Sequence, residues 1–147
     1  MIALVLRGTD DQPLGIHRTF LAADGRGKAT VEPERLLLGP CRGGAVQLAP
    51  VSHGDTLLVG EGIETTLTAM QASGHPGWAA LSTSGLSALV LPPRVRQVIV
   101  LADGDDPGEA AAVAAAQRWV NEGRQVRIAR APRGQDFNDV LTAPKGN

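Results

Sequence analysis

Short apolar runs alternate with helical patterns through the second half of the chain, and this alternation limits the possible folds more than any other feature. Four runs have the length of buried strands: residues 57–60, 78–81, 97–102 and 125–129. The first run is followed by Ile63, Leu67 and Met70 at helical spacing, and further helices are predicted at 85–91 and 107–122. Strands that alternate with helices form right-handed crossovers, so the pattern predicts a parallel sheet covered on both faces.

Residues 1–54 have a different character. Short segments at 1–6, 14–21 and 45–48 are separated by turn-forming residues, which predicts an antiparallel meander. A segment of this size buries little surface by itself, so we expect it to pack against the rest of the chain. The predicted fold class is therefore α/β: a four-stranded parallel sheet flanked by helices in residues 55–147, and a small N-terminal antiparallel β segment in residues 1–54.

Acidic residues follow two of the predicted strands at the point where each strand ends. Glu61 follows the first strand, and Asp103 and Asp105 follow the third. Ligands of open α/β sheets gather at the carboxyl ends of the strands, where these three carboxylates would meet. Three negative charges close together disfavour one another's ionisation unless a cation is bound. Mg²⁺ is the usual partner of such oxygen ligands, so we predict a metal-dependent site that acts on phosphates.

Not every acid in the loop before the long helix is free for chemistry. Asp106 is predicted to be the N-cap of that helix, with Pro107 at the first helical position. Glu109 completes a capping-box pattern three residues after the cap. Asp103 and Asp105 have no such structural role, and they precede the positive end of the helix. We therefore interpret Asp103 and Asp105 as metal ligands.

Composition narrows the function classes. The net charge of −1 excludes a globally basic nucleic-acid-binding protein, and an aromatic content of 3% argues against base-stacking platforms. Cys41 is the only cysteine, which excludes a disulfide framework and a cysteine zinc site. No apolar run approaches ~18 residues and no signal peptide is evident, so a cytoplasmic location is expected.

Basic residues are unevenly distributed. Five arginines crowd a short stretch that contains only one acid, Glu122: Arg118, Arg124, Arg127, Arg130 and Arg133. Two interpretations stay open for this stretch, a solvated face and a contact with a phosphate backbone.

The acidic motifs resemble those of the Toprim domain, which primases, topoisomerases and certain nucleases share. Gly60-Glu61-Gly62 is similar to its strand-end Glu motif, and Asp103-Gly104-Asp105 is similar to its strand-end Asp-x-Asp motif. The resemblance covers about residues 55–141 and implies a Toprim-like, Rossmann-like fold. It implies that Asp103 and Asp105 bind Mg²⁺ (or Mn²⁺), and that Glu61 acts as a further metal ligand or acid–base group.

Several shorter sequence segments resemble the DNA primases of phages and mobile elements. The similar segments are 60–65, 135–141, 15–21 and 38–40. This resemblance implies the catalytic-core fragment of a DNA primase, which performs nucleotidyl transfer on a DNA template with nucleoside triphosphates. A zinc-binding module and a helicase are expected elsewhere in the parent protein or in trans. The alternatives are a metal-dependent Toprim nuclease and a non-catalytic docking module. The chain has no Tyr, which argues against a self-sufficient topoisomerase.

Other residues are candidates for supporting roles. Lys28, Arg42 and Arg133 are candidate contacts to nucleotide or DNA because of their charge and their neighbouring glycines. Asp136 follows the fourth predicted strand, so it is either an additional acid of the site or the cap of the last short helix. Glu64, one turn after Glu61, is a cap or a solvent-facing residue, and a functional role at the site is the alternative.

Overall fold

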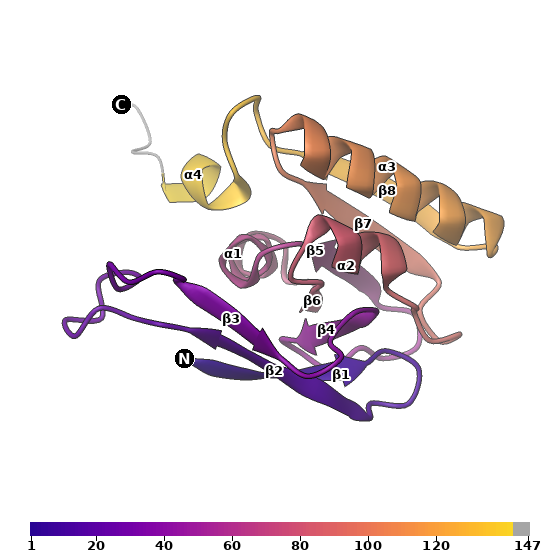
Figure 1. Cartoon of the computed structure of the whole chain (residues 1–147). Helices are drawn as coiled ribbons and strands as arrows, with labels where there is room; N and C mark the ends of the chain where they lie inside the picture. The colour runs from indigo at the N-terminus through magenta and orange to yellow at the C-terminus, as the bar shows by residue number, and fades with distance from the viewer. Residues whose placement is uncertain (143–147) are drawn as a thin grey trace.

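The computed structural model describes residues 1–142, which form one eight-stranded sheet with helices on both faces of its parallel half (Figure 1). The strand order is β3-β2-β1-β4-β6-β5-β7-β8. Residues 143–147, the end of the predicted second segment, lie outside the described residues.

The parallel half of the sheet contains the four strands that the apolar runs predict. They are β5 (Thr56–Gly60), β6 (Gly77–Ala79), β7 (Gln97–Ala102) and β8 (Gln125–Arg130). β5 pairs in parallel with both β6 and β7, and β7 pairs in parallel with β8. β5 lies in the middle of these strands and is covered on both faces, which is why residues 57–60 are a continuous apolar run rather than an alternating pattern.

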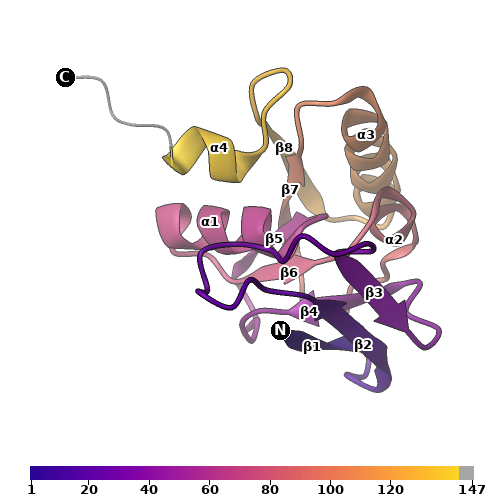
Figure 2. The same cartoon turned by 60° about the vertical axis from the view of Figure 1, so that its left-hand side comes forward.

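Two helices cover each face of this parallel half. α1 (Ile63–Ser73) packs with α4 (Phe137–Thr142), and α2 (Thr83–Ala88) packs with α3 (Asp106–Asn121). The turned view separates the two pairs (Figure 2). α1 ends at Gly74, which has the left-handed φ of 74° that glycine adopts readily, as the sequence predicts. α2 begins earlier than predicted because the Ser82 side chain caps it by accepting a hydrogen bond from the Gly85 amide.

The N-terminal strands extend the same sheet. They are β1 (Ile2–Arg7), β2 (Pro13–Thr19), β3 (Arg35–Leu38) and β4 (Gly44–Gln47). β4 returns to pair antiparallel with β1, so the connection is a Greek key rather than the predicted meander. β4 also pairs antiparallel with β6, which joins the two halves into one sheet.

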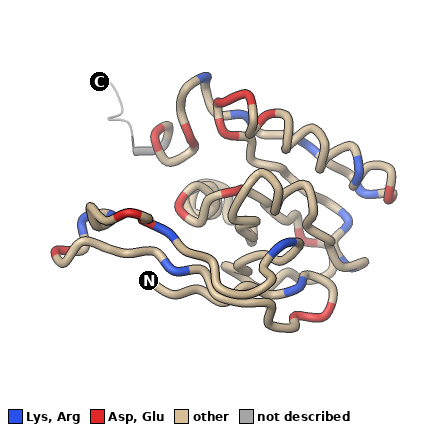
Figure 3. The backbone as a smooth tube through the Cα atoms, in the orientation of Figure 1, with Lys and Arg blue, Asp and Glu red and all other residues tan. Residues whose placement is uncertain are grey.

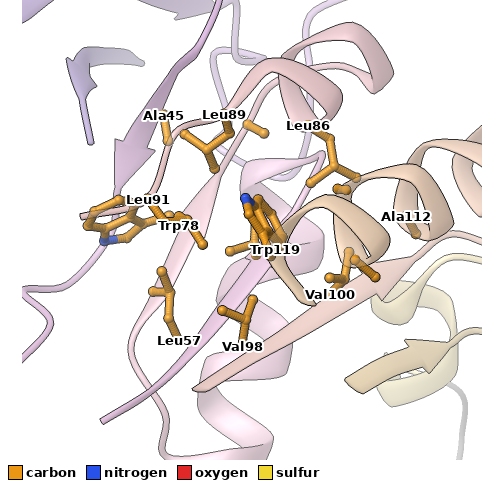
Figure 4. Close-up of a cluster of buried hydrophobic side chains, with 14 of the residues drawn as sticks. Ala45, Leu57, Trp78, Leu86, Leu89, Leu91, Val98, Val100, Ala112 and Trp119 are labelled. Atoms are coloured by element: carbon orange, nitrogen blue, oxygen red, sulfur yellow. The ribbon is translucent and has the colours of Figure 1, made fainter. Parts of the chain in front are cut away.

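The largest core lies between the sheet and the α2–α3 pair (Figure 4). Trp78 and Trp119 are fully buried there, and the indole of Trp78 donates a hydrogen bond to the Ala49 carbonyl oxygen at 3.3 Å. A second cluster joins the N-terminal strands to the start of α1 through Val5, Val46 and Ile63. No helix in residues 1–142 is both long and apolar enough to cross a bilayer.

Candidate metal and phosphate site

A cleft of about 600 Å³ lies at the carboxyl ends of the parallel strands. One part of its lining comes from the end of β5, the start of α1, the end of β7 and the start of α4. The other part comes from the segment between β2 and β3 and from the first residue of β3. The cleft therefore brings together residues that are far apart in the sequence.

Four carboxylates line this cleft: Glu61, Glu64, Asp103 and Asp136. Glu61 directly follows β5 and Asp103 directly follows β7, and the two strands are parallel neighbours, so their ends meet at one edge. Figure 3 shows acidic stretches where α3 begins and along α4, at the same end of the molecule. The sequence predicted the proximity of Glu61 and Asp103. Of the two alternatives for Asp136, its side chain caps α4 by accepting from the Asp139 amide at 2.8 Å, and the residue also lines the cleft.

Burial and mutual repulsion make the carboxyl groups of Glu61 and Asp103 hard to ionise. Burial, followed by the charges of Asp103 and Asp105, raises the pKa of Glu61 to about 7. Burial, followed by the charges of Asp136 and Asp105, raises the pKa of Asp103 above its usual value. A bound cation would remove this repulsion, so the electrostatics of the cleft favour a metal ligand role for these groups.

The donor chemistry of the cleft fits a hard divalent cation. Asp103 Oδ1 is buried and has no hydrogen-bond partner, and carboxylate oxygens are the ligands that Mg²⁺ and Mn²⁺ prefer. Within residues 1–142, no three His, Cys, Asp or Glu side chains are positioned as they stand to hold one ion. The ligand types required for a metal are therefore present, whereas a closed ligand cage is not.

Gly104 fixes the loop that carries Asp103. Its amide donates to the Gln135 carbonyl oxygen at 2.9 Å, and its carbonyl oxygen accepts from the Gly134 amide at 2.8 Å. A Cβ at this position would lie 2.1 Å from the Pro132 carbonyl oxygen, which no side chain tolerates. Glycine is therefore required here, and the two loops that supply Asp103 and Asp136 are held together through their backbones.

The structure corrects the predicted cap of α3. Asp105, not Asp106, is the N-cap, and its Oδ1 accepts a hydrogen bond from the Gly108 amide at 2.7 Å. Asp106 is instead the first helical residue, with its side chain 91% exposed. The capping box is also not formed, because the Glu109 carboxylate accepts hydrogen bonds from Arg130. The predicted ligand Asp105 thus has a structural role, while it also borders a smaller hollow together with Asp103.

A family model described as the Toprim domain matches residues 56–145, more than half of the chain. The chain belongs to the Toprim family. A second model, described as a domain of unknown function (DUF7146), matches residues 1–48. A comparison with curated proteins gives no match.

Solved structures similar to this Toprim protein include DNA primase cores. The DnaG catalytic core has a TM-score of 0.63 at 21% identity, covering 93% of this chain and 46% of that one. A DNA primase domain from Pseudomonas aeruginosa has a TM-score of 0.58 at 20% identity, covering 99% and 53%. The RNA polymerase domain of Mycobacterium tuberculosis primase DnaG has the same TM-score and identity, covering 95% and 50%. This Toprim chain shares their fold and spans about half of their length.

Basic residues face the acids across the cleft of the Toprim domain. Lys28, a predicted contact residue, lines the cleft and lies 3.3 Å from Glu64 Oε1. Arg35 at the start of β3 also lines the cleft, and the sequence analysis missed it. It lies opposite Thr19 in the β2–β3 register, so only knowledge of that pairing would have located it.

Burial by itself would raise the pKa of Glu64. Its own backbone amide and Lys28 more than offset this by hydrogen bonding and charge, and Arg35 contributes charge, so the pKa lies below the usual value. Glu64 is therefore an ionised carboxylate at the start of α1, paired with a cation from the N-terminal segment.

The other two predicted basic residues lie outside this cleft. Arg42 borders a separate hollow beside the start of α2. Arg133 pairs with Asp106 at 3.5 Å and borders another hollow that includes Asp103 and Asp105. Arg133 is therefore close to the acidic loop, whereas Arg42 is not part of the cleft that contains Glu61 and Asp103.

Most of the C-terminal arginine cluster has structural partners. The guanidinium group of Arg118 donates to the Leu89 carbonyl oxygen, and that of Arg124 donates to the carbonyl oxygens of Val95 and Leu91. Arg130 is bound to Glu109. These contacts give Arg118, Arg124 and Arg130 roles within the fold, which differs from both interpretations that the sequence left open.

Proposed function

We propose that this Toprim chain is the catalytic-core part of a DNA primase, which uses Mg²⁺ or Mn²⁺ to join nucleotides into primers on a DNA template. One observation carries the proposal: the carboxylates of Glu61 and Asp103 line the same cleft as the cationic side chains of Lys28 and Arg35. Phosphoryl transfer depends mainly on positioning and on charge neutralisation, and such a cleft offers both. The similarity to DNA primase cores supports this proposal at the level of the fold.

Each residue has a defined task in this proposal. Asp103 and Asp105 hold the metal with Glu61, and Asp136 is an additional acid at the same edge. When bound, the metal supplies positive charge that neutralises the phosphate oxygens of the nucleotide. The pKa of Glu61 is about 7, so this carboxyl group can hold or release a proton near neutral pH. Lys28 and Arg35 bind phosphate groups, and Arg133 and Arg42 are further contacts for the template.

The proposed partners follow from the same reading. The chain spans about half the length of the primase cores that it resembles, so we propose that a zinc-binding module and a helicase act with it, in the parent protein or in trans. The substrates are a DNA template and nucleoside triphosphates. The DnaG domain from Mycobacterium tuberculosis was crystallised with double-stranded DNA, which is consistent with a nucleic-acid partner for this fold.

The test is a primer-synthesis assay on single-stranded DNA with nucleoside triphosphates and Mg²⁺ or Mn²⁺. We expect Asp103→Asn and Asp105→Asn to lower synthesis at least about 100-fold, because both remove a charged metal ligand. Asp106→Asn is the matched control, since it changes a neighbouring acid whose side chain is 91% exposed and pairs with Arg133 instead of lining the cleft. The same proteins are melted with and without the metal, and the stabilisation by metal should be lost only in the Asp103 and Asp105 variants.

The outcomes separate the alternatives. Full synthesis by Asp103→Asn would contradict the proposed site. Metal-dependent cleavage of DNA without nucleoside triphosphates would identify the chain as a nuclease. Absence of both activities, with no change of Tm on adding the metal, would favour the docking module.

A further inference from the structure

The N-terminus of α1 opens into the cleft without a side-chain cap. Gly62 is the N-cap residue, and it has no side chain to accept hydrogen bonds from the first turn. The first intrahelical bond runs from the Thr66 amide to the Gly62 carbonyl oxygen at 3.1 Å. Within residues 1–142, the amides of Ile63 and Thr65 donate to no protein acceptor. Free amides at a helix N-terminus, together with the helix dipole, favour an anion.

Thr65 provides a second and independent observation at the same place. Its side chain is only 4% exposed and lines the cleft, yet across residues 1–142 no partner exists for its hydroxyl group. The other hydroxyl groups of α1 each donate to the carbonyl oxygen four residues earlier: Thr66 to Gly62, Thr68 to Glu64 and Ser73 to Ala69.

The carbonyl oxygen four residues before Thr65 belongs to Glu61, which lies outside α1. This oxygen accepts a hydrogen bond from the Leu81 amide at 2.8 Å, and none from Thr65. The hydroxyl oxygen of Thr65 is not among the buried side-chain atoms of residues 1–142 that lack a partner, so it is accessible from the cleft. The hydroxyl of Thr65 is therefore available to a molecule that enters the cleft.

The Glu64 carboxylate occupies donors at this helix start that a bound anion would otherwise use. It pairs with Lys28 at 3.3 Å and accepts a hydrogen bond from its own amide. Arg35 lines the same cleft and is exposed. A phosphate group in the cleft would attract Lys28 and Arg35 and would meet both Thr65 and the free amides.

We propose that the N-terminus of α1, with the Thr65 hydroxyl, Lys28 and Arg35, is a phosphate-binding site that works without a metal ion. The inference rests on the proposed function for the source of the phosphate, which is either the incoming nucleotide or the backbone of the nucleic acid. Both sources present the same chemistry to the site, and the experiment separates them.

The experiment titrates the metal-free protein, in EDTA and at low salt, with inorganic pyrophosphate in a calorimeter. We expect Thr65→Val, which keeps the shape of the side chain, to weaken binding roughly tenfold, because it removes one hydrogen bond to a charged group. Glu64→Gln should strengthen binding, since it removes the competing carboxylate. Thr56→Val is the matched control: its hydroxyl donates to Gln97 at the opposite end of β5, and binding should not change.

A second arm replaces pyrophosphate with a short single-stranded DNA. A loss of pyrophosphate affinity in Thr65→Val supports a nucleotide phosphate, and a loss of DNA affinity supports the nucleic-acid backbone. Arg35→Gln changes an exposed residue of the same cleft and should weaken binding of the same ligand. This variant keeps the proposal testable if Thr65→Val fails to fold.

Two results test the phosphate site and the proposed metal-dependent function separately. Equal affinity of Thr65→Val and wild type for both probes overturns the phosphate site, whether or not Asp103→Asn abolishes primer synthesis. Weaker phosphate binding by Thr65→Val, together with full primer synthesis by Asp103→Asn, supports the phosphate site and contradicts the proposed metal-dependent function.

Discussion

Among single residues, Glu61 has the most unusual environment. The pKa of its carboxyl group is raised from 4.5 to about 7 by burial and by the charges of Asp103 and Asp105. In the unfolded chain the same group titrates near its ordinary value. Between these two values the folded protein binds a proton that the unfolded chain has lost, so the metal-free protein becomes less stable as the pH rises from about 4.5 to about 7.

Glu61→Gln removes this pH dependence. In EDTA at pH 8, we expect the variant to be more stable than wild type by on the order of 1 kcal/mol, a value reduced to allow for the partial exposure of Glu61. At pH 4 the two proteins should have nearly the same free energy of unfolding. Urea unfolding at both pH values measures the difference. A variant that is less stable than wild type at pH 8 would show that the carboxylate is not repelled in the folded state.

The sequence predicted that Glu61 and Asp103 lie at one edge of the sheet because both acids directly follow apolar strands, and such runs define the strand ends well. It failed to choose correctly between Asp105 and Asp106 as the helix cap. Both are good capping residues, and Pro107 fits the second helical position as well as the first, so only the backbone geometry decides. Arg35 was missed because its place in the cleft depends on a strand pairing across the intervening loop.

At the scale of elements, Arg124 connects the start of β8 to the segment before β7. Its side chain is 8% exposed and donates to the carbonyl oxygens of Val95 and Leu91. Arg130, at the other end of β8, pairs with Glu109 but is 54% exposed. Both arginines bind acceptors with good geometry, but their burial differs, so we expect their contributions to stability to differ as well.

Arg124→Met should therefore destabilise the protein by roughly 2–4 kcal/mol, since it leaves buried carbonyl oxygens without donors. Arg130→Met serves as the matched comparison and should cost less than about 1 kcal/mol, as exposed ion pairs do. Thermal or urea unfolding of the two variants measures both values. Equal losses would mean that the Arg124 contacts contribute no more than a surface pair.

Helices and strands with a clear apolar run or helical spacing were predicted well, and short elements without such a pattern were not. β5 and β7 were located by their apolar runs, and α1 by its spacing and its terminal glycine. β3 was missed because Leu36, Leu37 and Leu38 show no alternation, and β2 rather than local sequence holds this strand in place. The Greek-key order depends on β4 returning to β1, which no local pattern encodes.

At the scale of the whole molecule, one sheet runs through both halves of residues 1–142. Ala45 and Val51 pack in the main core with Trp78, and Val5 and Val46 pack with Ile63. The N-terminal strands therefore depend on the Toprim core for the burial of their apolar side chains.

Unfolding should consequently be a single transition. Far-ultraviolet circular dichroism, which reports on all elements, and tryptophan fluorescence, which reports on Trp78 and Trp119 in the main core, should give the same midpoint in urea. An earlier transition seen by dichroism alone would show that the N-terminal strands unfold independently.

The pairing of β4 with β6 has a consequence for how the cleft can receive a ligand. Arg35 and the acids that follow β5 and β7 belong to opposite walls of the cleft, and these walls are carried by a single hydrogen-bonded sheet. Swinging one wall toward the other as a rigid body would break the pairs between Val46 and Ala79 and between Gln47 and Trp78. The distance between the walls is thus set when the chain folds, and the ordering of the two walls adds little to the entropic cost of binding.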